Sequence, residues 1–216
     1  MSVPVSETTT PGHPPVAAGR TRGDTGAFLR EFFRSPTRVG AVAPSSRRLA
    51  AAITAPIPER GEPVVVELGP GTGAFTKVIQ DRLGGRGRHL AIELSPALAG
   101  LLASRHPGVE VLTGNAADCR SLVAERGVRA VDVVVSGLPW ASFPQELQRG
   151  ALGAVCEVLE PDGAFTTFAY VLAAQTPPAR RFRQLLRDRF EEVVMGRTVL
   201  GNLPPAFVYH ARRPRR

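Results

Sequence analysis

Residues 64–73 read Val-Val-Val-Glu-Leu-Gly-Pro-Gly-Thr-Gly, an apolar run that ends in a cluster of glycines. A short apolar run of this kind is typical of a strand buried on both faces of a parallel sheet. Glycines allow the chain to turn sharply and to approach a ligand closely. The segment that follows, residues 74–83, has a helical pattern, and the first N–H groups of a helix attract anionic groups. The stretch therefore predicts a strand, a ligand-binding turn and a helix.

The rest of the chain continues this alternation of strands and helices. The expected strands are 64–68, 89–94, 109–112, 131–136, 164–170, 192–199 and 206–211, and the expected helices are 74–83, 96–105, 116–125, 144–159 and 180–190. Such alternation predicts an α/β, Rossmann-like fold with a seven-stranded, mostly parallel sheet and helices on both faces. No helix separates the last two strands, so they are expected to form an antiparallel C-terminal hairpin. Pro161-Asp162-Gly163 is expected to be a tight turn into the fifth strand.

Three segments are expected along the chain. Residues 1–23 are rich in Ser, Thr, Pro and Gly and are predicted to be a disordered N-terminal tail. Residues 24–55 are predicted to hold N-terminal helices, one of them with Phe and Arg residues at helical spacing. These helices could form a lid over the site or dock on a membrane. Residues 56–216 are predicted to be the α/β domain.

Composition narrows the function classes only in part. The net charge is +8, but Lys77 is the sole lysine among the 27 basic residues. The arginine excess therefore has two open explanations, an anionic partner or the coding bias of a GC-rich genome. Cys119 and Cys156 have neither disulfide nor metal-ligand spacing, so no metal is expected and a cytoplasmic, reducing environment is favoured. Neither a membrane-spanning run nor a signal peptide is evident.

The ligand of the glycine turn has three candidates. A P-loop is excluded, because no Gly-Lys-Ser/Thr follows the turn. Gly69, Gly71 and Ala74 satisfy the dinucleotide pattern G-x-G-x-x-G/A, so a nicotinamide cofactor has to be considered. Glu93 ends the second expected strand about 20 residues after Gly73, where an acid can bind ribose hydroxyls.

The form Glu-x-Gly-x-Gly-x-Gly over residues 67–73 resembles motif I of the class I S-adenosylmethionine-dependent methyltransferases. The resemblance implies that residues 56–216 bind S-adenosylmethionine. It implies a set of cofactor-binding residues on four strand ends: Glu67, Gly69, Gly71, Gly73, Glu93, Leu94, Asn115, Ala116 and Ser136. Asn115 stands where the family usually has Asp, with Asp118 as a second candidate.

A second motif, Ser136-Gly137-Leu138-Pro139-Trp140, ends the fourth expected strand. It resembles the Asn/Asp-x-Pro-aromatic signature of methyltransferases that act on amines. The resemblance implies that backbone carbonyls at Leu138 and Pro139 and the face of Trp140 hold the amine for attack. Gly137 departs from the signature, which has Asn or Asp. Tyr170, at the end of the fifth strand, is a further catalytic candidate that could orient the substrate or relay a proton.

From about residue 28 to residue 212 the chain resembles the bacterial phospholipid N-methyltransferases. The matching segments are 39–46 (Val-Gly-Ala-Val-Ala-Pro-Ser-Ser), 67–76, 136–140 and 202–206 (Asn-Leu-Pro-Pro-Ala). The resemblance implies N-methylation of the headgroup amine of phosphatidylethanolamine or a related aminolipid. Arg197 and Asn202 would then meet the lipid phosphate. It also implies peripheral contact of residues 25–38 with an anionic membrane, on the inner face of the cell membrane.

Three alternatives stay open. An rRNA adenine dimethyltransferase shares the fold and the Leu-Pro-aromatic turn, but Gly137 and the short C-terminal segment make nucleic acid an unlikely partner. A small-molecule N-methyltransferase would not need the Phe/Arg helix to bind membranes. A non-catalytic module would not need the intact glycine turn together with Glu93 and Trp140.

Overall fold

The computed structural model describes residues 45–216. Its sheet has seven strands: β1 (Val64–Leu68), β2 (Arg88–Glu93), β3 (Glu110–Thr113), β4 (Val131–Ser136), β5 (Leu159–Tyr170), β6 (Phe190–Met195) and β7 (Ala206–Pro214). The strand order is β3-β2-β1-β4-β5-β7-β6, with the first five strands parallel and β7 antiparallel to both of its neighbours. The predicted Rossmann-like architecture and antiparallel C-terminal hairpin are confirmed.

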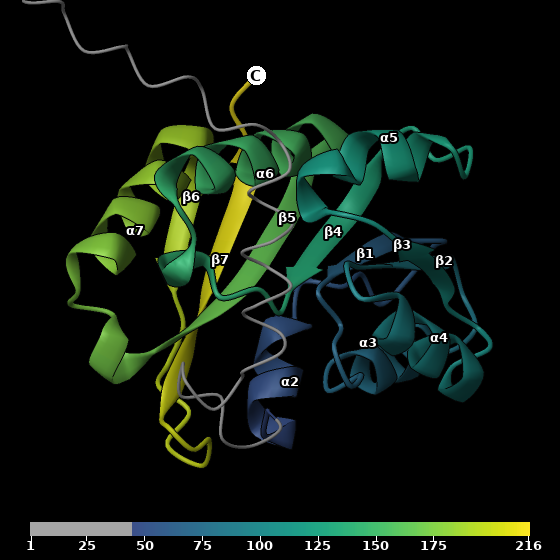
Figure 1. The fold of residues 1–216 in the computed structure, drawn as a ribbon, viewed down its shortest axis with the longest axis horizontal. Coiled ribbons are helices and arrows are strands. Elements are labelled where there is room, and N and C mark those ends of the chain that lie inside the picture. Colours follow the sequence, from purple (N-terminus) through teal and green to yellow (C-terminus); the bar gives the residue numbers. More distant parts are fainter. Residues whose placement is uncertain (1–44) are drawn as a thin grey trace, which may run out of the picture.

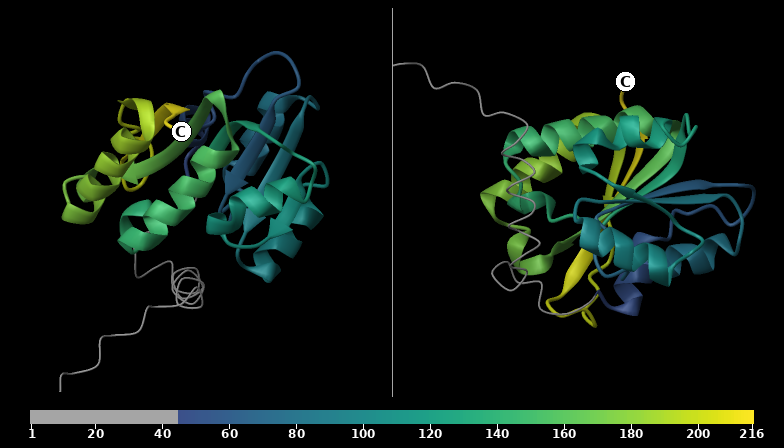
Figure 2. Two further views of the ribbon diagram at one scale, coloured as in Figure 1. Left: turned by 90° about the horizontal axis from the view of Figure 1, so that it is seen from above. Right: turned by 45° about the vertical axis from the view of Figure 1, so that its right-hand side comes forward.

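Helices cover both faces of the sheet (Figures 1 and 2). One face carries α5 (Cys119–Ala124), α6 (Gln145–Val158) and α7 (Pro177–Arg189), and the other carries α2 (Arg47–Ile53), α3 (Thr76–Leu83) and α4 (Pro96–Arg105). Strand residues alternate between the two faces, so each face builds its own apolar core. The larger core lies under α5, α6 and α7, and the smaller cores lie under α2, α3 and α4.

Three predictions of local structure need correction. The turn expected at 161–163 is instead a widened part of β5, where one residue of β4 (Asp132) faces four of β5 (160–163) between the pairs Val131–Leu159 and Val133–Ala164. The helix expected over 116–125 is a 3₁₀ turn at Ala116–Asp118 followed by α5. Strand β6 ends at Met195 rather than residue 199. The predicted tail 1–23 and residues 24–44 of the segment 24–55 lie outside the described residues. Of the predicted N-terminal helices, only α2 can be compared with the structure.

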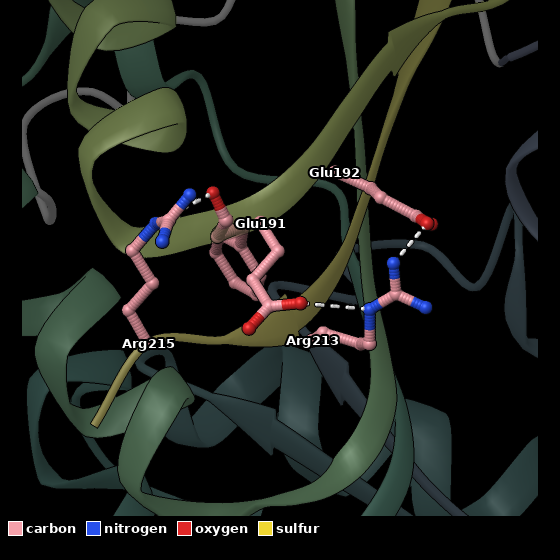
Figure 3. Close-up of polar contacts among 5 residues, drawn as sticks. Glu191, Glu192, Arg213 and Arg215 are labelled. Carbon is pink, nitrogen blue, oxygen red and sulfur yellow. Dashed lines mark hydrogen bonds and ion pairs between the residues drawn. The ribbon is translucent and has the colours of Figure 1, made fainter.

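The end of the hairpin is tied by charged side chains (Figure 3). The Arg213 guanidinium pairs with Glu191 and Glu192 of the edge strand β6. Arg215 donates from Nε to the carbonyl of Phe190. The Arg213 pairs are half-exposed, so each adds little stability, but together they cover an edge that could otherwise pair with another chain. The carboxyl end of β5 lies at the opposite end of the hairpin, where Tyr170 pairs with Ala206.

Candidate functional site

The glycine turn between β1 and α3 is open toward a ligand. Gly69, Gly71 and Gly73 all have positive φ values of 66°, 56° and 90°, which favour glycine. A Cβ on Gly71 would meet no atom within 4 Å. No side chain caps the first turn of α3. The turn therefore leaves open space at Gly71 beside a helix N-terminus, which is compatible with the predicted cofactor cradle.

Glu93 at the end of β2 closes on this turn. Its carboxylate accepts hydrogen bonds from the backbone N–H groups of Gly71, at 3.1 Å, and Ser95, at 2.9 Å. Burial raises the pKa of Glu93 above its ordinary value, and the nearby Glu67 carboxylate raises it further, while the backbone N–H groups oppose this. The carboxylate is thus held at the predicted place for binding hydroxyl groups.

Glu67 lies beneath the turn rather than at its outer surface. The side chain is fully buried, and its Oε2 accepts a hydrogen bond from Thr76 Oγ1 at 2.7 Å. His89 Nε2 lies 3.3 Å from the same oxygen, while Gln80 Nε2 lies 2.9 Å from His89 Nδ1. Because an amide nitrogen can only donate, Gln80 donates to His89 Nδ1, and the other ring nitrogen faces Glu67. This arrangement suits Glu67 for holding the turn against α3.

The residues after β2 and β3 form the neighbouring wall. Asn115 caps the 3₁₀ turn, and its Oδ1 accepts from Ala117 N at 3.0 Å, so its NH₂ group remains available to a ligand. Ala116 is buried beside it, and Leu94 packs on the larger core. Asp118 is exposed, and it faces a different hollow, next to α6. Asn115 is therefore better placed than Asp118 for contact with a cofactor ring.

The glycine turn and the motif after β4 touch each other. Gly137 N donates to Leu68 O at 2.9 Å, and a Cβ on Gly137 would lie 2.8 Å from the carbonyl oxygen of Gly69. In return, a Cβ on Gly69 would lie 2.5 Å from Leu138 Cδ2. This close approach explains the departure of Gly137 from the amine-methyltransferase signature, because an Asn at this position would collide with the turn.

Leu138 and Pro139 form a tight bend just after the carboxyl end of β4. Pro139 has φ −83° and ψ 67°, and Trp140 N donates to Leu138 O at 3.0 Å, which defines an inverse γ-turn. Ser142 N donates to Pro139 O at 2.9 Å. Each carbonyl keeps a second lone pair for a further hydrogen bond.

Two side chains of this motif, Trp140 and Ser136, are buried and have partners inside the fold. Trp140 is only 2% exposed, its ring stacks on Phe182 with centroids 5.1 Å apart, and its Nε1 donates to Ser136 Oγ at 2.9 Å. Phe182 therefore covers one face of the indole ring. Ser136 is also fully buried, and its hydroxyl accepts from the indole and from Leu138 N. Ser136 thus supports the bend from below.

An apolar cavity of about 220 Å³ opens beside the bend. It lies between the carboxyl ends of β4 and β5 and the helix α7, and it is lined by Gly137–Ser142, Phe168–Tyr170, Ala173, Ala179, Phe182 and Tyr209. Both tyrosines of the chain line it. Within residues 45–216 neither tyrosine hydroxyl has a hydrogen-bond partner, and burial raises the pKa of both. The two neutral hydroxyls are therefore free to bind a polar group inside an apolar pocket.

Tyr209 is a site residue that sequence reasoning missed. The sequence places it only on the last strand, with no motif around it. The antiparallel pairing of β7 with β5 aligns Tyr209 with Thr167, whose buried hydroxyl also lacks a partner within the described residues. Its one available signal was rarity, since the chain has only two tyrosines.

The two residues expected to meet a lipid phosphate behave differently. Asn202 is buried, its Oδ1 accepts from Ser46 N at 2.9 Å, and its Nδ2 donates to Pro204 O at 2.8 Å. Its side chain therefore ties the β6–β7 loop to the start of α2, which contradicts the phosphate assignment. Arg197 is exposed and lines a hollow together with Arg48.

Comparison of the chain with known proteins shows its family. Residues 65–163 match the family model of a methyltransferase domain. The chain belongs to the class I S-adenosylmethionine-dependent methyltransferases. Among curated proteins, it is 38% identical over 188 residues to the ornithine lipid N-methyltransferase of Singulisphaera acidiphila, covering 86% of this chain and 94% of the relative.

Solved structures agree at the level of the fold. The O-methyltransferase from Bacillus cereus, solved with S-adenosylhomocysteine, is 15% identical with a TM-score of 0.63, over 88% of this chain and 90% of that one. The 1,6-didemethyltoxoflavin-N1-methyltransferase of Burkholderia thailandensis is 16% identical with a TM-score of 0.63, over 94% and 93% of the two chains. The cofactor of this protein is S-adenosylmethionine, and the open backbone at Gly71 beside the Glu93 carboxylate fits it.

Glu93 gives the first testable prediction. Glu93→Gln is expected to weaken S-adenosylmethionine binding about 10- to 100-fold, because hydrogen bonds to a charged acceptor contribute ~1.5–3 kcal/mol. Since burial raises the pKa of Glu93, wild-type affinity should fall on acidification from a pH above the ordinary glutamate range. The variant should lack this fall. Isothermal titration calorimetry across pH measures both effects, with the exposed Glu125→Gln as control.

The raised pKa of Glu93 makes folding stability change with pH in the opposite direction to cofactor affinity. A raised carboxyl pKa means that the folded state binds the proton more tightly than the unfolded state, so the ionised Glu93 costs stability above that pKa. Acidification should relieve this cost while it weakens cofactor binding. Identical pH profiles for wild type and Glu93→Gln in the binding titration would contradict the assigned role.

Proposed function

We propose that this protein transfers a methyl group from S-adenosylmethionine to the headgroup amine of an aminolipid, either ornithine lipid or phosphatidylethanolamine. The observation that carries the proposal is the contact between the glycine turn and the Leu138-Pro139 bend. This contact puts a cofactor cradle and an amine-binding bend next to each other, beside an apolar cavity. The identity to an ornithine lipid N-methyltransferase over most of both chains supports a lipid amine.

The cofactor would lie on Gly69, Gly71, Gly73, Glu93 and Asn115. Glu93 would accept hydrogen bonds from ribose hydroxyls, and the free Asn115 NH₂ would face the adenine. When bound, S-adenosylmethionine supplies an electrophilic methyl group on a sulfonium. Glu67 and Ser136 act from below, by holding the turn and the bend in register.

The substrate amine would sit at the bend. The carbonyl oxygens of Leu138 and Pro139 would accept its N–H groups and direct the nitrogen lone pair toward the methyl carbon. The new N–C bond would form as the C–S bond of the cofactor broke, in a direct displacement that leaves S-adenosylhomocysteine. An amine is mostly protonated at neutral pH, so one proton must leave first. Tyr170 and Tyr209 offer the nearby hydroxyls through which it could pass or by which the headgroup is oriented.

Tyr209→Phe gives the second prediction. It should lower kcat/KM for the aminolipid roughly 5- to 10-fold, because one hydrogen bond contributes about 1 kcal/mol. The free energy of unfolding and the affinity for S-adenosylmethionine should stay unchanged, since the hydroxyl has no partner within the described residues. Steady-state kinetics, calorimetry and urea unfolding together measure this. An unchanged kcat/KM would remove Tyr209 from the site.

A substrate panel tests the proposal. Labelled S-adenosylmethionine is mixed with the protein and, separately, ornithine lipid, phosphatidylethanolamine, free ornithine and ribosomal RNA. We expect label in at least one lipid and none in free ornithine or RNA. Label in RNA or in the free amino acid alone would overturn the lipid assignment and favour one of the two alternatives left open by the sequence. Contact of residues 25–38 with the membrane remains part of the proposal, although these residues lie outside those described.

A further inference from the structure

Three leucines protrude from loops at the end of the sheet where β5 finishes and β7 begins. Leu172, Leu200 and Leu203 are 85%, 78% and 75% exposed. Leu172 belongs to the 3₁₀ turn after β5 (Val171–Ala173), and the other two belong to the loop between β6 and β7. Single exposed leucines are common on protein surfaces, but several on adjoining loops mark an interaction site.

Backbone contacts hold these loops side by side. Val171 N donates to Pro205 O at 3.0 Å, so the turn that carries Leu172 is joined to the end of the β6–β7 loop. A bridge between Val199 and Ala206 closes that loop, with Leu200 and Leu203 inside it. The pairing of Tyr170 with Ala206 places both segments at the edge where the apolar cavity opens. Leu172 therefore lies next to Ala173, which lines the cavity, and the loop with Leu200 and Leu203 is joined to the same turn.

Positive charge lies beside the leucines. Arg48 and Arg197 line one hollow together with Leu200, and Arg48 reaches to 3.9 Å from a Cβ position on Gly201. Among the described residues 45–216, none that lines this hollow is acidic. Within residues 45–216 neither arginine takes part in an ion pair, in contrast to Arg88, Arg120 and Arg213. The two guanidinium groups are therefore free to meet anionic groups from outside the chain.

We propose that the surface formed by Leu172, Leu200, Leu203, Arg48 and Arg197 docks this protein on a bilayer that contains anionic lipids. The leucines would enter the boundary between headgroups and acyl chains, and the arginines would stay at the phosphate level. The proposal rests on the proposed function for its purpose, which is to hold the cavity entrance against the layer that contains the aminolipid. Anionic lipids complement this surface, because its described residues are basic and apolar.

Vesicle sedimentation of the full chain tests the surface separately from catalysis. The vesicles contain phosphatidylcholine and phosphatidylglycerol, neither of which offers an amine to methylate. We expect the wild type to bind, and Leu200→Asp with Leu203→Asp to reduce the partition coefficient roughly tenfold. Arg48→Ala with Arg197→Ala should have a similar effect at low salt, from ~1 kcal/mol per basic residue. It should have less effect at high salt, where charges are screened.

The matched controls lie on α4, which packs on β2 and β3, far along the sheet from β6 and β7. Leu101→Asp and Arg105→Ala alter an exposed leucine and an exposed arginine there and should leave binding unchanged. The leucine variant should also keep wild-type methylation of a short-chain, dispersed aminolipid, which shows that it is folded. Equal vesicle binding by all variants, or none by the wild type, would overturn the docking surface. Vesicle binding without methylation of any lipid would instead overturn the proposed function alone.

Discussion

Gly137→Asn is expected to weaken cofactor binding by up to about 100-fold, although it restores the residue typical of amine methyltransferases. The new Cβ would lie 2.8 Å from the Gly69 carbonyl oxygen and 3.6 Å from Phe75 Cε2. Since the first contact is with backbone, the glycine turn itself must move. Overpacking of this kind costs ~1–3 kcal/mol, which corresponds to a loss of up to about 100-fold in affinity. Calorimetric titration with S-adenosylmethionine measures the loss.

Gly150→Asn is the matched control for this prediction. Gly150 is exposed on α6, and a Cβ there would meet nothing within 4 Å. The control should bind the cofactor as the wild type does. Wild-type affinity in Gly137→Asn would mean that the glycine turn and the Leu138-Pro139 bend are not in the close contact on which the proposed site depends.

Trp140→Ala is expected to lower the free energy of unfolding by about 4 kcal/mol, because it empties a packed core position. The indole stacks on Phe182 and also contacts Phe143 and Phe165. At ~2–4 °C per kcal/mol for a chain of this size, the melting temperature should fall by about 10 °C. Circular dichroism during urea and thermal unfolding measures both. Leu172→Ala, at an exposed apolar residue, should change stability by less than ~0.5 kcal/mol.

Trp140→Phe separates a structural role from a direct role in binding the amine. Phenylalanine keeps most of the packing but leaves the Ser136 hydroxyl without its indole donor, at a cost of about 1–2 kcal/mol. We expect this variant to fold and to keep most of its kcat, because Phe182 covers one face of the indole. A folded Trp140→Phe with kcat lowered 100-fold or more would instead return Trp140 to the catalytic group.

The fold could be predicted because its evidence is local in the sequence. Each strand is a short apolar run, each helix follows a recognisable start, and the absence of a helix between β6 and β7 already requires a hairpin. Boundaries were harder where tertiary pairing decides them. The widened part of β5 at 160–163 depends on its register with β4, which no pattern of β5 itself reveals.

The candidate site could be predicted only where backbone geometry dominates. The glycine turn and Glu93 follow from spacing, because a strand, a turn and a neighbouring strand end must meet. The surroundings of Trp140 and Asn202 could not be predicted, because each side chain has a buried partner far from the motif that suggested its function. Asn202 bonds Ser46 across 156 residues, and the Trp140 ring meets Phe182 on α7. Such contacts exist only in the folded chain.

The most direct test of methyl transfer to a lipid amine is mass spectrometry of the product. Ornithine lipid and phosphatidylethanolamine are each incubated with the protein and S-adenosylmethionine that carries a trideuterated methyl group, and the lipids are then fragmented. The proposed function predicts that at least one lipid gains the deuterated methyl and that the label stays with the headgroup nitrogen on fragmentation. Label on oxygen or in the acyl chains, or no labelled lipid from a protein that binds the cofactor, would contradict it.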